Sequence, residues 1–455
     1  MNKKIQITNI SLKKIDESIT EIIYVFSANK SEYHLRYRIS GFTEFDPDTY
    51  DYRIDSFVTT LLLHAMRGGY DFVSNYPISK KLYYQILWHI VSQIHRCNKD
   101  LTSLITIDAP LTEDHLGGNY VGTGISCGVD SFATIYEYTD LMPIKDYKIS
   151  HLFYNKVGAH DGQIGRFDDD IETNLFHDQL AKALHVSKLL NLPLIIIESN
   201  LNEVLDRFFG FTGYEQTHTI RNIGAIYLFQ QFFARYYYAD AYSLDHFQLS
   251  VNTTMSKYEK WFLPLLSNER ISFYSANKAM TRVEKTKLIS EFPLSYDNLL
   301  VCWTHGENCG ICKKCVRTLV TLDVLGCLDL YKNSFDIDAY KEKRESYILD
   351  IMNNKEDFFS KEIYDYMKSV NHPYLELDNK NINIKNRVES NPESKLFTKD
   401  KTNEEIIAGK EISDLQQTVI RYKTELDAVY ASHSWRLGNI LIQPFHFLKR
   451  LFEKK

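Results

Sequence analysis

The sequence has no stretch of 18 consecutive apolar residues, so it predicts no transmembrane helix. Its first residues, MNKKIQITNISLKKIDESITE, carry lysines but no continuous apolar segment, and we expect no secretory signal. Charge of either sign is not in large excess: 53 Lys and Arg face 59 Asp and Glu, and a net charge of −6 gives no general attraction to nucleic acid. These absences predict a cytoplasmic protein that does not bind nucleic acid.

The composition is that of an ordinary globular protein. Apolar residues make up 44% of the 455 positions and charged residues 25%, which excludes a disordered chain, a collagen-like fibre and a disulfide miniprotein. This length suggests two or three domains with a large core. The seven cysteines are an odd number and four of them fall within fourteen residues, which favours metal binding in a reducing compartment over disulfides.

Residues 1–110 are predicted to form a small N-terminal α+β domain. KIQITNISL, EIIYVFSA and EYHLRYRISG alternate as three strands. Two helices are expected to follow: 57–66, capped by Ser56 and ended by Gly68-Gly69, and 80–95, capped by Ser79. The second helix has its apolar residues on one face: Leu82, Ile86, Ile90 and Ile94.

Residues 111–330 change to strand–helix alternation. The expected strands are YVGTGIS, KISHLFYN, LPLIIIES and FQLSV, and the expected helices start near Ser131 and cover 178–190 and 217–235. Alternation of this kind predicts an α/β fold with a parallel sheet and helices on both sides.

The rest of the chain is predicted in three parts. Residues 331–376 form a helical extension, and the polar, Asn-rich residues 377–402 a flexible linker. In 403–455, a heptad seam leads to a basic amphipathic tail. The seam at 405–430 predicts either homo-oligomer formation or a helix docked on its own protein. The tail (SWRLG…P…LKR) resembles tails of bacterial glycosyltransferases and predicts either peripheral membrane contact or packing on protein.

The run from Ser126 to Ser131, S-C-G-V-D-S, follows a strand and opens a helix. Gly128 lets the backbone approach an anion, and the N–H groups of the helix start can bind phosphate oxygens. Asp130 can hold Mg²⁺ beside the phosphates. The Walker pattern G-x-x-x-x-G-K-[ST] is absent from the chain. The alternative is an ordinary strand-to-helix turn with serine and aspartate caps.

Four cysteines lie in the pattern C-x6-C-x2-C-x2-C. Their spacing suits a closed tetrahedral Zn²⁺ site with a structural role, and Gly310 permits the turn between ligands. Two disulfides or an iron–sulfur cluster are the alternatives. His305 is either a competing ligand or, as we expect, an exposed neighbour. The predicted ligands are Cys302, Cys309, Cys312 and Cys315.

The loop resembles the SGGxDS loop of the PP-loop ATP pyrophosphatases, an adenine nucleotide alpha hydrolase-like fold. C-G-I-C-K-K-C-V-R also resembles the cysteine signature of 7-cyano-7-deazaguanine synthase, with Arg317 in place. The resemblance covers roughly residues 115–330. It implies that Ser126, Cys127, Gly128, Val129, Asp130 and Ser131 bind the pyrophosphate of ATP. Cys127 replaces the usual glycine; it is either passive, provided its backbone angles are ordinary, or a reactive thiol.

The resemblance also implies positions outside the loop. Arg221 and Lys285 are candidate cations for the developing pyrophosphate, with exposed surface charge as the alternative. Tyr154 would lie beside adenine and Asn222 belongs to an Arg-Asn pair of the family. His160 is either an acid–base group or a loop histidine without a role.

The reaction that the resemblance implies is adenylation by ATP. An AMP-forming ligase or amidotransferase would activate a carboxylate or carbonyl oxygen for attack by ammonia or an amine. The tail suggests a second substrate class, a sugar in surface-polysaccharide biosynthesis. A third hypothesis is a nucleotide-binding scaffold without turnover. No glutaminase signature is present, so ammonia would be free or come from a partner.

Overall fold

The computed structural model describes residues 3–113, 117–159, 170–211, 213–302 and 305–377. Met1–Leu375 form one compact unit. His160, almost all of the predicted linker, the heptad segment and the basic tail lie outside the described residues, so what we expect of them stays a prediction. Within the described part of the chain, no helix is long and apolar enough to cross a membrane.

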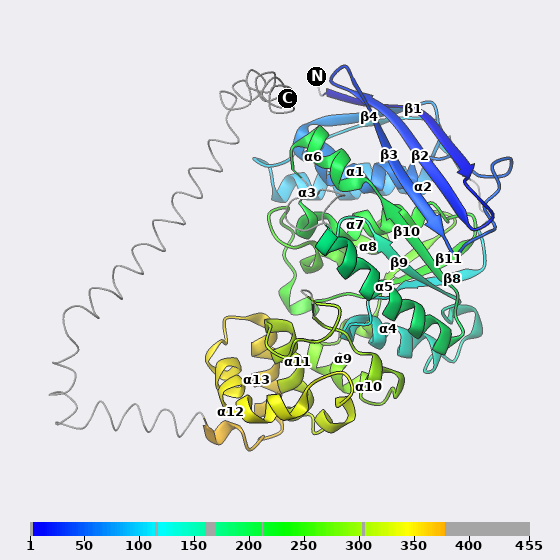
Figure 1. The fold of residues 1–455 in the computed structure, drawn as a ribbon. Coiled ribbons are helices and arrows are strands. Elements are labelled where there is room, and N and C mark those ends of the chain that lie inside the picture. Colours follow the sequence, from blue (N-terminus) through cyan, green and yellow to red (C-terminus); the bar gives the residue numbers. More distant parts are fainter. Residues whose placement is uncertain (1–2, 114–116, 160–169, 212, 303–304, 378–455) are drawn as a thin grey trace, which may run out of the picture. The chain divides into compact units, whose positions relative to one another are not determined.

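A ten-stranded, mostly parallel sheet runs through the compact unit (Figure 1). Its order is β12-β11-β8-β9-β10-β3-β2-β1-β4-β6. The run from β12 to β10 is parallel, and so is the run β1-β4-β6, but β10, β3, β2 and β1 pair antiparallel. The strands are β1 (Lys3–Lys14), β2 (Ile19–Ala28), β3 (Ser31–Ser40), β4 (Tyr70–Ser74), β6 (Ile107–Asp108), β8 (Tyr120–Gly124), β9 (His151–Lys156), β10 (Leu194–Ser199), β11 (Phe233–Tyr238) and β12 (Ser272–Ser275).

The three predicted N-terminal strands are present, but they do not belong to a separate domain. β10 pairs with β9 on one side and with β3 on the other, so one sheet crosses residue 110. The predicted boundary at residue 110 differs from the structure. The alternating pattern of a strand shows which of its faces is buried, but it does not show which strand lies beside it. β5 (Ile78–Ser79) and β7 (Leu111–Thr112) form a second, two-stranded sheet across the same position.

The two N-terminal helices match their predicted periodicity. α1 (Asp55–Gly68) ends at the left-handed Gly69, but Ser56 lies inside it and Ile54 is the N-cap. The second helix comprises α2 (Lys80–Gln85), a π-helical turn (Ile86–Val91) and α3 (Ser92–Cys97). A spacing of four exceeds the 3.6 residues of an α-helical turn, and the wider π turn keeps such residues on one face. All four predicted face residues are fully buried: Leu82, Ile86, Ile90 and Ile94.

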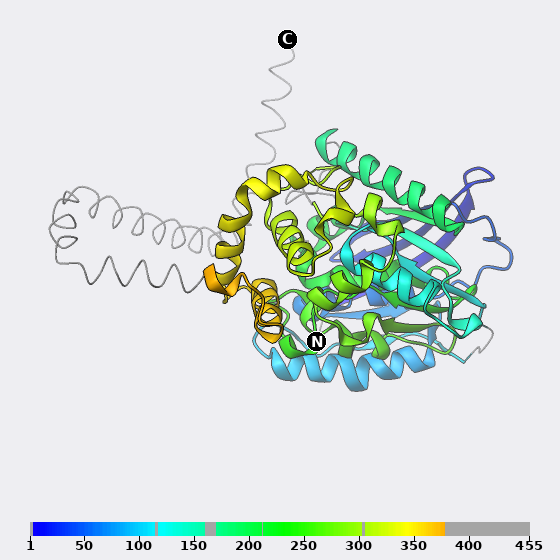
Figure 2. The same ribbon diagram turned by 90° about the horizontal axis from the view of Figure 1, so that it is seen from below.

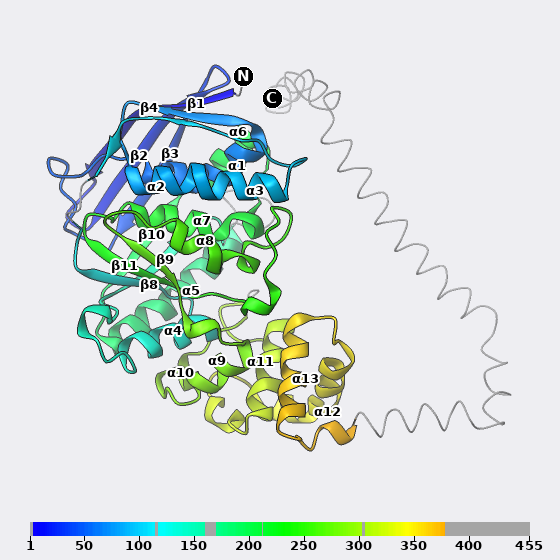
Figure 3. The same ribbon diagram turned by 180° about the vertical axis from the view of Figure 1, so that it is seen from behind.

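Helices cover both faces of the sheet. Figures 1 and 3, seen from opposite sides, place α5 and α6 on one side and α2, α7 and α8 on the other. The bounds are α4 (Val129–Thr139), α5 (Asp170–Leu190), α6 (Leu201–Phe209), α7 (Tyr214–Tyr227) and α8 (Glu259–Leu265).

Two elements differ from the prediction. The helix expected over 217–235 ends at Tyr227, and Phe233–Tyr238 is strand β11. FQLSV is irregular and not a strand; its backbone bonds to Lys257 and to the Asn98 side chain. Short apolar runs do not distinguish helix from strand without their partners, and β11 is fixed by pairing with β8 and β12.

A cluster of helices follows β12 (Figures 1 and 2). It includes the predicted extension after residue 330, where α12 and α13 are found. The helices are α9 (Arg282–Ile289), α10 (Leu294–Asn298), α11 (Lys313–Val324), α12 (Ile337–Asn353) and α13 (Phe358–Ser369).

Candidate phosphate site and metal centre

The loop 126–131 lies at the switch point of the parallel strands. The chain runs from β8 to β9 to β10 in one direction and then returns to place β11 on the other side of β8. Open α/β sheets bind ligands at the carboxyl ends of strands where the order reverses in this way. The loops after β8 and β11 therefore meet at the favoured position for a ligand.

The loop leads directly into α4. Gly128 is the N-cap, with φ −82° and ψ 174°, and Ser131 Oγ donates to its carbonyl at 3.1 Å. The first intrahelical bond runs from Phe132 N–H to the Gly128 carbonyl at 3.0 Å. The N–H groups of Val129, Asp130 and Ser131 precede that bond, and such groups at a helix start are suited to an anion.

Cys127 has a backbone conformation that was not expected of it. Its φ is +57°, in the left-handed region that a residue with a Cβ rarely adopts. The passive alternative for Cys127 required ordinary backbone angles, and the residue does not have them. The thiol is 1% exposed, and burial raises its pKa to about 12, so it is not a thiolate at neutral pH.

Asp130 lies among cations. Its Oδ2 is 2.8 Å from the Arg282 guanidinium and its Oδ1 is 3.2 Å from Lys285 Nζ. Lys285 is fully buried and also donates to Asp240 Oδ1 at 2.6 Å; Asp240 follows β11 and is itself fully buried. Lys285 is therefore not an exposed surface charge, and it lies against Asp130 of the loop 126–131.

Asp240 is bound by more than Lys285. Lys260 forms an ion pair with its Oδ2, and the Ser275 hydroxyl donates to the same oxygen. Neither Asp240 nor Arg282 was predicted from the sequence. Arg282 had a signal, because it lies three residues before Lys285 and so on the same helix face. Nothing in the sequence pointed to Asp240, because only the order of the strands in the sheet places it beside Lys285.

Two further cations reach this region from α11. The Arg317 guanidinium lies 3.9 Å from the centre of the Phe359 ring, and Arg282 lies 5.1 Å from the same ring. Burial and nearby Arg282 lower the pKa of Arg317 to about 10, and burial together with Arg317 lowers the pKa of Lys314. Positive charge is thus concentrated near Asp130.

Arg221 does not join this group. It is fully buried and donates to Thr217 Oγ1 at 2.8 Å, to Asn202 Oδ1 at 2.5 Å and to the Val157 carbonyl at 3.3 Å. No described contact connects it with residues 126–131. The interpretation of Arg221 as an exposed charge is wrong, and its partners indicate a role in joining α6, α7 and the end of β9.

The other predicted nucleotide contacts lie along β9. Tyr154 is buried beside Phe176 on α5, with ring centres 5.5 Å apart. Asn155 Nδ2 donates to Asn222 Oδ1 at 3.0 Å. Asn222 is therefore placed at the carboxyl end of β9, next to the strand that precedes the loop.

The four predicted cysteine ligands converge. Their sulfur atoms all lie within 4.8 Å of one another, and tetrahedral Zn²⁺ with bonds of about 2.3 Å separates sulfurs by about 3.8 Å. Gly310 has φ +71°, as the tight turn requires, and Cys312 N–H donates to Cys309 Sγ at 3.3 Å. His305 is exposed, with Nδ1 3.7 Å from Cys302 Sγ. The cluster could hold a metal ion such as zinc: Cys302, Cys309, Cys312 and Cys315.

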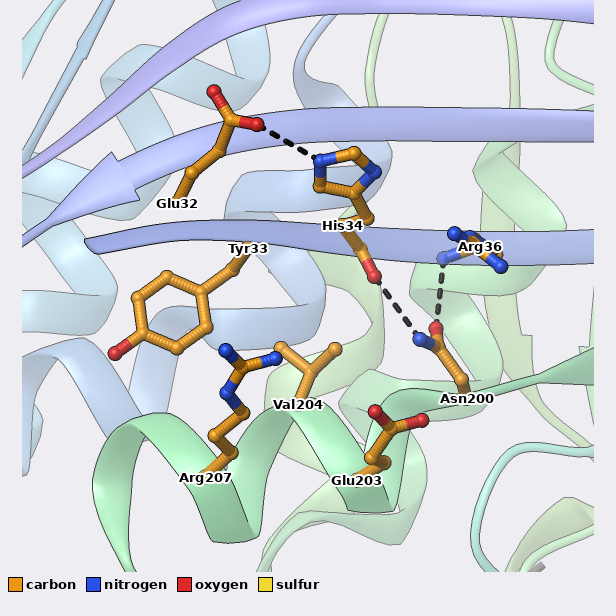
Figure 4. A pocket seen from close by; sticks show the side chains of 8 residues that line it. All are labelled: Glu32, Tyr33, His34, Arg36, Asn200, Glu203, Val204 and Arg207. Carbon is orange, nitrogen blue, oxygen red and sulfur yellow. Dashed lines mark hydrogen bonds and ion pairs between the residues drawn. The ribbon is translucent and has the colours of Figure 1, made fainter.

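A cavity of about 310 Å³ lies elsewhere, between β3 and α6 (Figure 4). In it, Asn200 accepts from Arg36 N–H at 2.8 Å and donates to the His34 carbonyl at 3.0 Å, which continues the pairing of β3 beyond the end of β10. The surrounding side chains are of mixed charge, including Glu32, Glu203 and Arg207. None of the loop or cysteine residues lines this cavity.

No family model matches the chain, and neither a curated protein nor a solved structure is significantly similar to it. The class that the fold and site define is an α/β protein with a largely parallel sheet, a helix-start loop flanked by cations, and a four-cysteine cluster able to hold a metal ion.

Proposed function

We propose that this protein is an ATP-dependent, AMP-forming ligase or amidotransferase of the PP-loop type. The observation that carries the proposal is the meeting of the α4 start with Lys285 and Arg282 at the switch point of the sheet. A helix start supplies neutral donors and the two side chains supply charge, and a pyrophosphate needs both.

The loop residues have separate tasks in this proposal. The N–H groups at the start of α4 receive phosphate oxygens, and Ser126 adds a hydroxyl donor. Ser131 adds a second one when its hydroxyl turns from the Gly128 carbonyl to the ligand. Lys285 and Arg282 stabilise the negative charge that develops on the leaving pyrophosphate. Gly128 has room for the ligand: a Cβ there would meet only Ser126 Oγ at 3.4 Å and the Leu300 carbonyl at 3.7 Å.

ATP would supply the AMP group, and Mg²⁺ would neutralise phosphate charge. Both oxygens of Asp130 already pair with cations, so coordination of Mg²⁺ by Asp130 requires one of these ion pairs to open. Until then Asp130 holds Arg282 and Lys285 in place. The acceptor in this proposal is a carboxylate or carbonyl oxygen, attacked after adenylation by ammonia or an amine.

The four-cysteine cluster is assigned to Zn²⁺ in a structural role. A closed set of four sulfurs leaves no position for water or substrate, and binding by four thiolates contributes to folding. The sugar-amidotransferase hypothesis depends on the tail alone, which lies outside the described residues, and the scaffold hypothesis depends on Cys127.

ATP–pyrophosphate exchange in the presence of candidate carboxylate and sugar acceptors tests the proposal. Lys285→Gln should reduce exchange by at least a hundredfold, whereas Lys287→Gln, an exposed lysine on the same helix, should leave it unchanged. Asp130→Ala should abolish AMP formation and keep the fold, because Lys285 retains Asp240. Persistent AMP formation in Asp130→Ala would show that the loop is not the site.

A further inference from the structure

The cysteine loop and the phosphate loop are joined through one short backbone segment, residues 299–302. Leu300 N–H donates to the Cys127 carbonyl at 2.8 Å. On the other side, Asn308 Oδ1 accepts from Val301 N–H at 2.8 Å and from Cys302 N–H at 3.2 Å, and Asn308 Nδ2 donates to the Leu299 carbonyl at 2.7 Å. The segment that delivers the first cysteine is therefore fixed to both loops.

The second connection is helix α11, which begins inside the cysteine cluster. Cys312 is its N-cap, and Cys315 N–H donates to Cys312 Sγ at 3.5 Å. Because two of the four cysteines define the first turn, their positions fix the direction in which the next residues of that turn point. Arg317 lies two residues after Cys315.

Arg317, just after the first turn of α11, lies beside Arg282. Arg317 and Arg282 lie against the same Phe359 ring, at 3.9 Å and 5.1 Å, and Arg282 in turn bonds to Asp130 at 2.8 Å. Among the described residues, no carboxylate lies within ion-pair distance of Arg317. Neighbouring guanidinium groups repel each other, and an anion between them removes this cost.

We propose that the metal-bound cysteine loop positions the second half of the phosphate site. It places Arg317, and with it Lys314, as binding residues for the polyphosphate end of the ligand, opposite the N–H groups of α4. Metal occupancy therefore sets the affinity for phosphate. This inference rests on the proposed function only in taking a nucleotide polyphosphate as the ligand.

Binding of inorganic pyrophosphate, measured by calorimetry, tests the inference in four states of the full chain. These are the metal-loaded wild type, the metal-stripped wild type, metal-loaded Arg317→Gln and metal-stripped Arg317→Gln. Loss of the charge-assisted bonds should weaken binding about tenfold to a hundredfold in metal-loaded Arg317→Gln, with unchanged metal content. Stripping the wild type should weaken binding by at least a similar factor, and stripping Arg317→Gln should weaken it by a clearly smaller factor, because only Lys314 then remains to be displaced.

Two variants serve as controls. Arg317→Lys keeps the charge and should recover part of the affinity, which a merely structural role would not predict. Lys313→Gln removes an exposed lysine of the same turn that pairs with Asp357, and it should bind pyrophosphate like the wild type.

A reciprocal measurement avoids stripping altogether. Linkage requires pyrophosphate to raise the affinity of the cysteine cluster for zinc by the same factor, measured with a competing chelator. Three results would overturn the inference. These are unchanged pyrophosphate binding by Arg317→Gln, an equal loss of affinity when the metal is stripped from the wild type and from Arg317→Gln, and a zinc affinity that pyrophosphate does not change. Normal ATP–pyrophosphate exchange in Arg317→Gln would refute the inference alone. If the four states bind pyrophosphate as predicted but no acceptor supports ATP–pyrophosphate exchange, the adenylating function alone would be refuted.

Discussion

Gly128→Ala should separate folding from the proposed binding of phosphate at loop 126–131. The backbone of Gly128 has φ −82°, which alanine adopts without strain, and the nearest atoms to a new Cβ lie at 3.4 Å and 3.7 Å. Alanine is a poorer N-cap than glycine by roughly half a kcal/mol, and the stiffer unfolded chain offsets a similar amount. The free energy of unfolding should therefore change by less than about 1 kcal/mol.

The effect on binding should be much larger. The methyl group would occupy the space that lets phosphate oxygens reach the first N–H groups of α4, and each lost bond to a charged group is worth about 1.5–3 kcal/mol. We expect ATP affinity to fall at least tenfold in calorimetry, while urea unfolding gives nearly the wild-type midpoint. A Gly128→Ala protein that binds ATP within threefold of the wild type would refute the placement of phosphate at this helix start.

The remaining predictions concern the neighbouring groups. Cys127→Gly should keep ATP–pyrophosphate exchange. Its urea unfolding midpoint should not fall, because relief of the left-handed backbone strain offsets the lost packing of the thiol. Loss of exchange would indicate a reactive thiol. In the wild type the buried Cys127 should not react with iodoacetamide at neutral pH until the protein unfolds. Metal analysis should find one zinc per chain, and Co²⁺ substitution should give the absorption bands of tetrahedral thiolate coordination; Cys309→Ser should lower metal content and melting temperature. Burial raises the pKa of Glu259 from 4.5 to about 8, so the folded state holds a proton that the unfolded state releases. The free energy of unfolding should then decrease as pH rises from about 4.5 to 8, and urea titrations of Glu259→Gln should show a shallower decrease.

The sequence predicted the local parts of the site well. Four cysteines with fixed spacing, and a glycine loop between strand and helix, depend on residues close together in the chain. Lys285 was linked to Asp130 across 155 positions, but only through the family resemblance. Arg221 was predicted as a site cation from the same resemblance, but its side chain bonds to other residues. The resemblance alone therefore did not distinguish Arg221 from Lys285.

What the sequence could not predict depends on strand order. The apolar run of β10 indicated burial on both faces, but nothing in it named β3 as a neighbour. Asp240 and Ser275 end different strands and meet only because β11 and β12 are adjacent. The aromatic residues 233–238 continue an apolar pattern that suits a helix as well as a strand, and pairing with β8 decides between them.

The antiparallel attachment of β3 to β10 has a practical consequence. A chain shortened to its α/β part, beginning near residue 111, would leave β10 with its hydrogen-bonding groups open along one side. Its sequence, LIIIES, is apolar and rich in β-branched residues, and uncovered edges of this kind recruit other strands. We therefore expect the first forty residues to protect the protein from self-association, and the shortened chain to aggregate even with loop 126–131 and the cysteine loop intact.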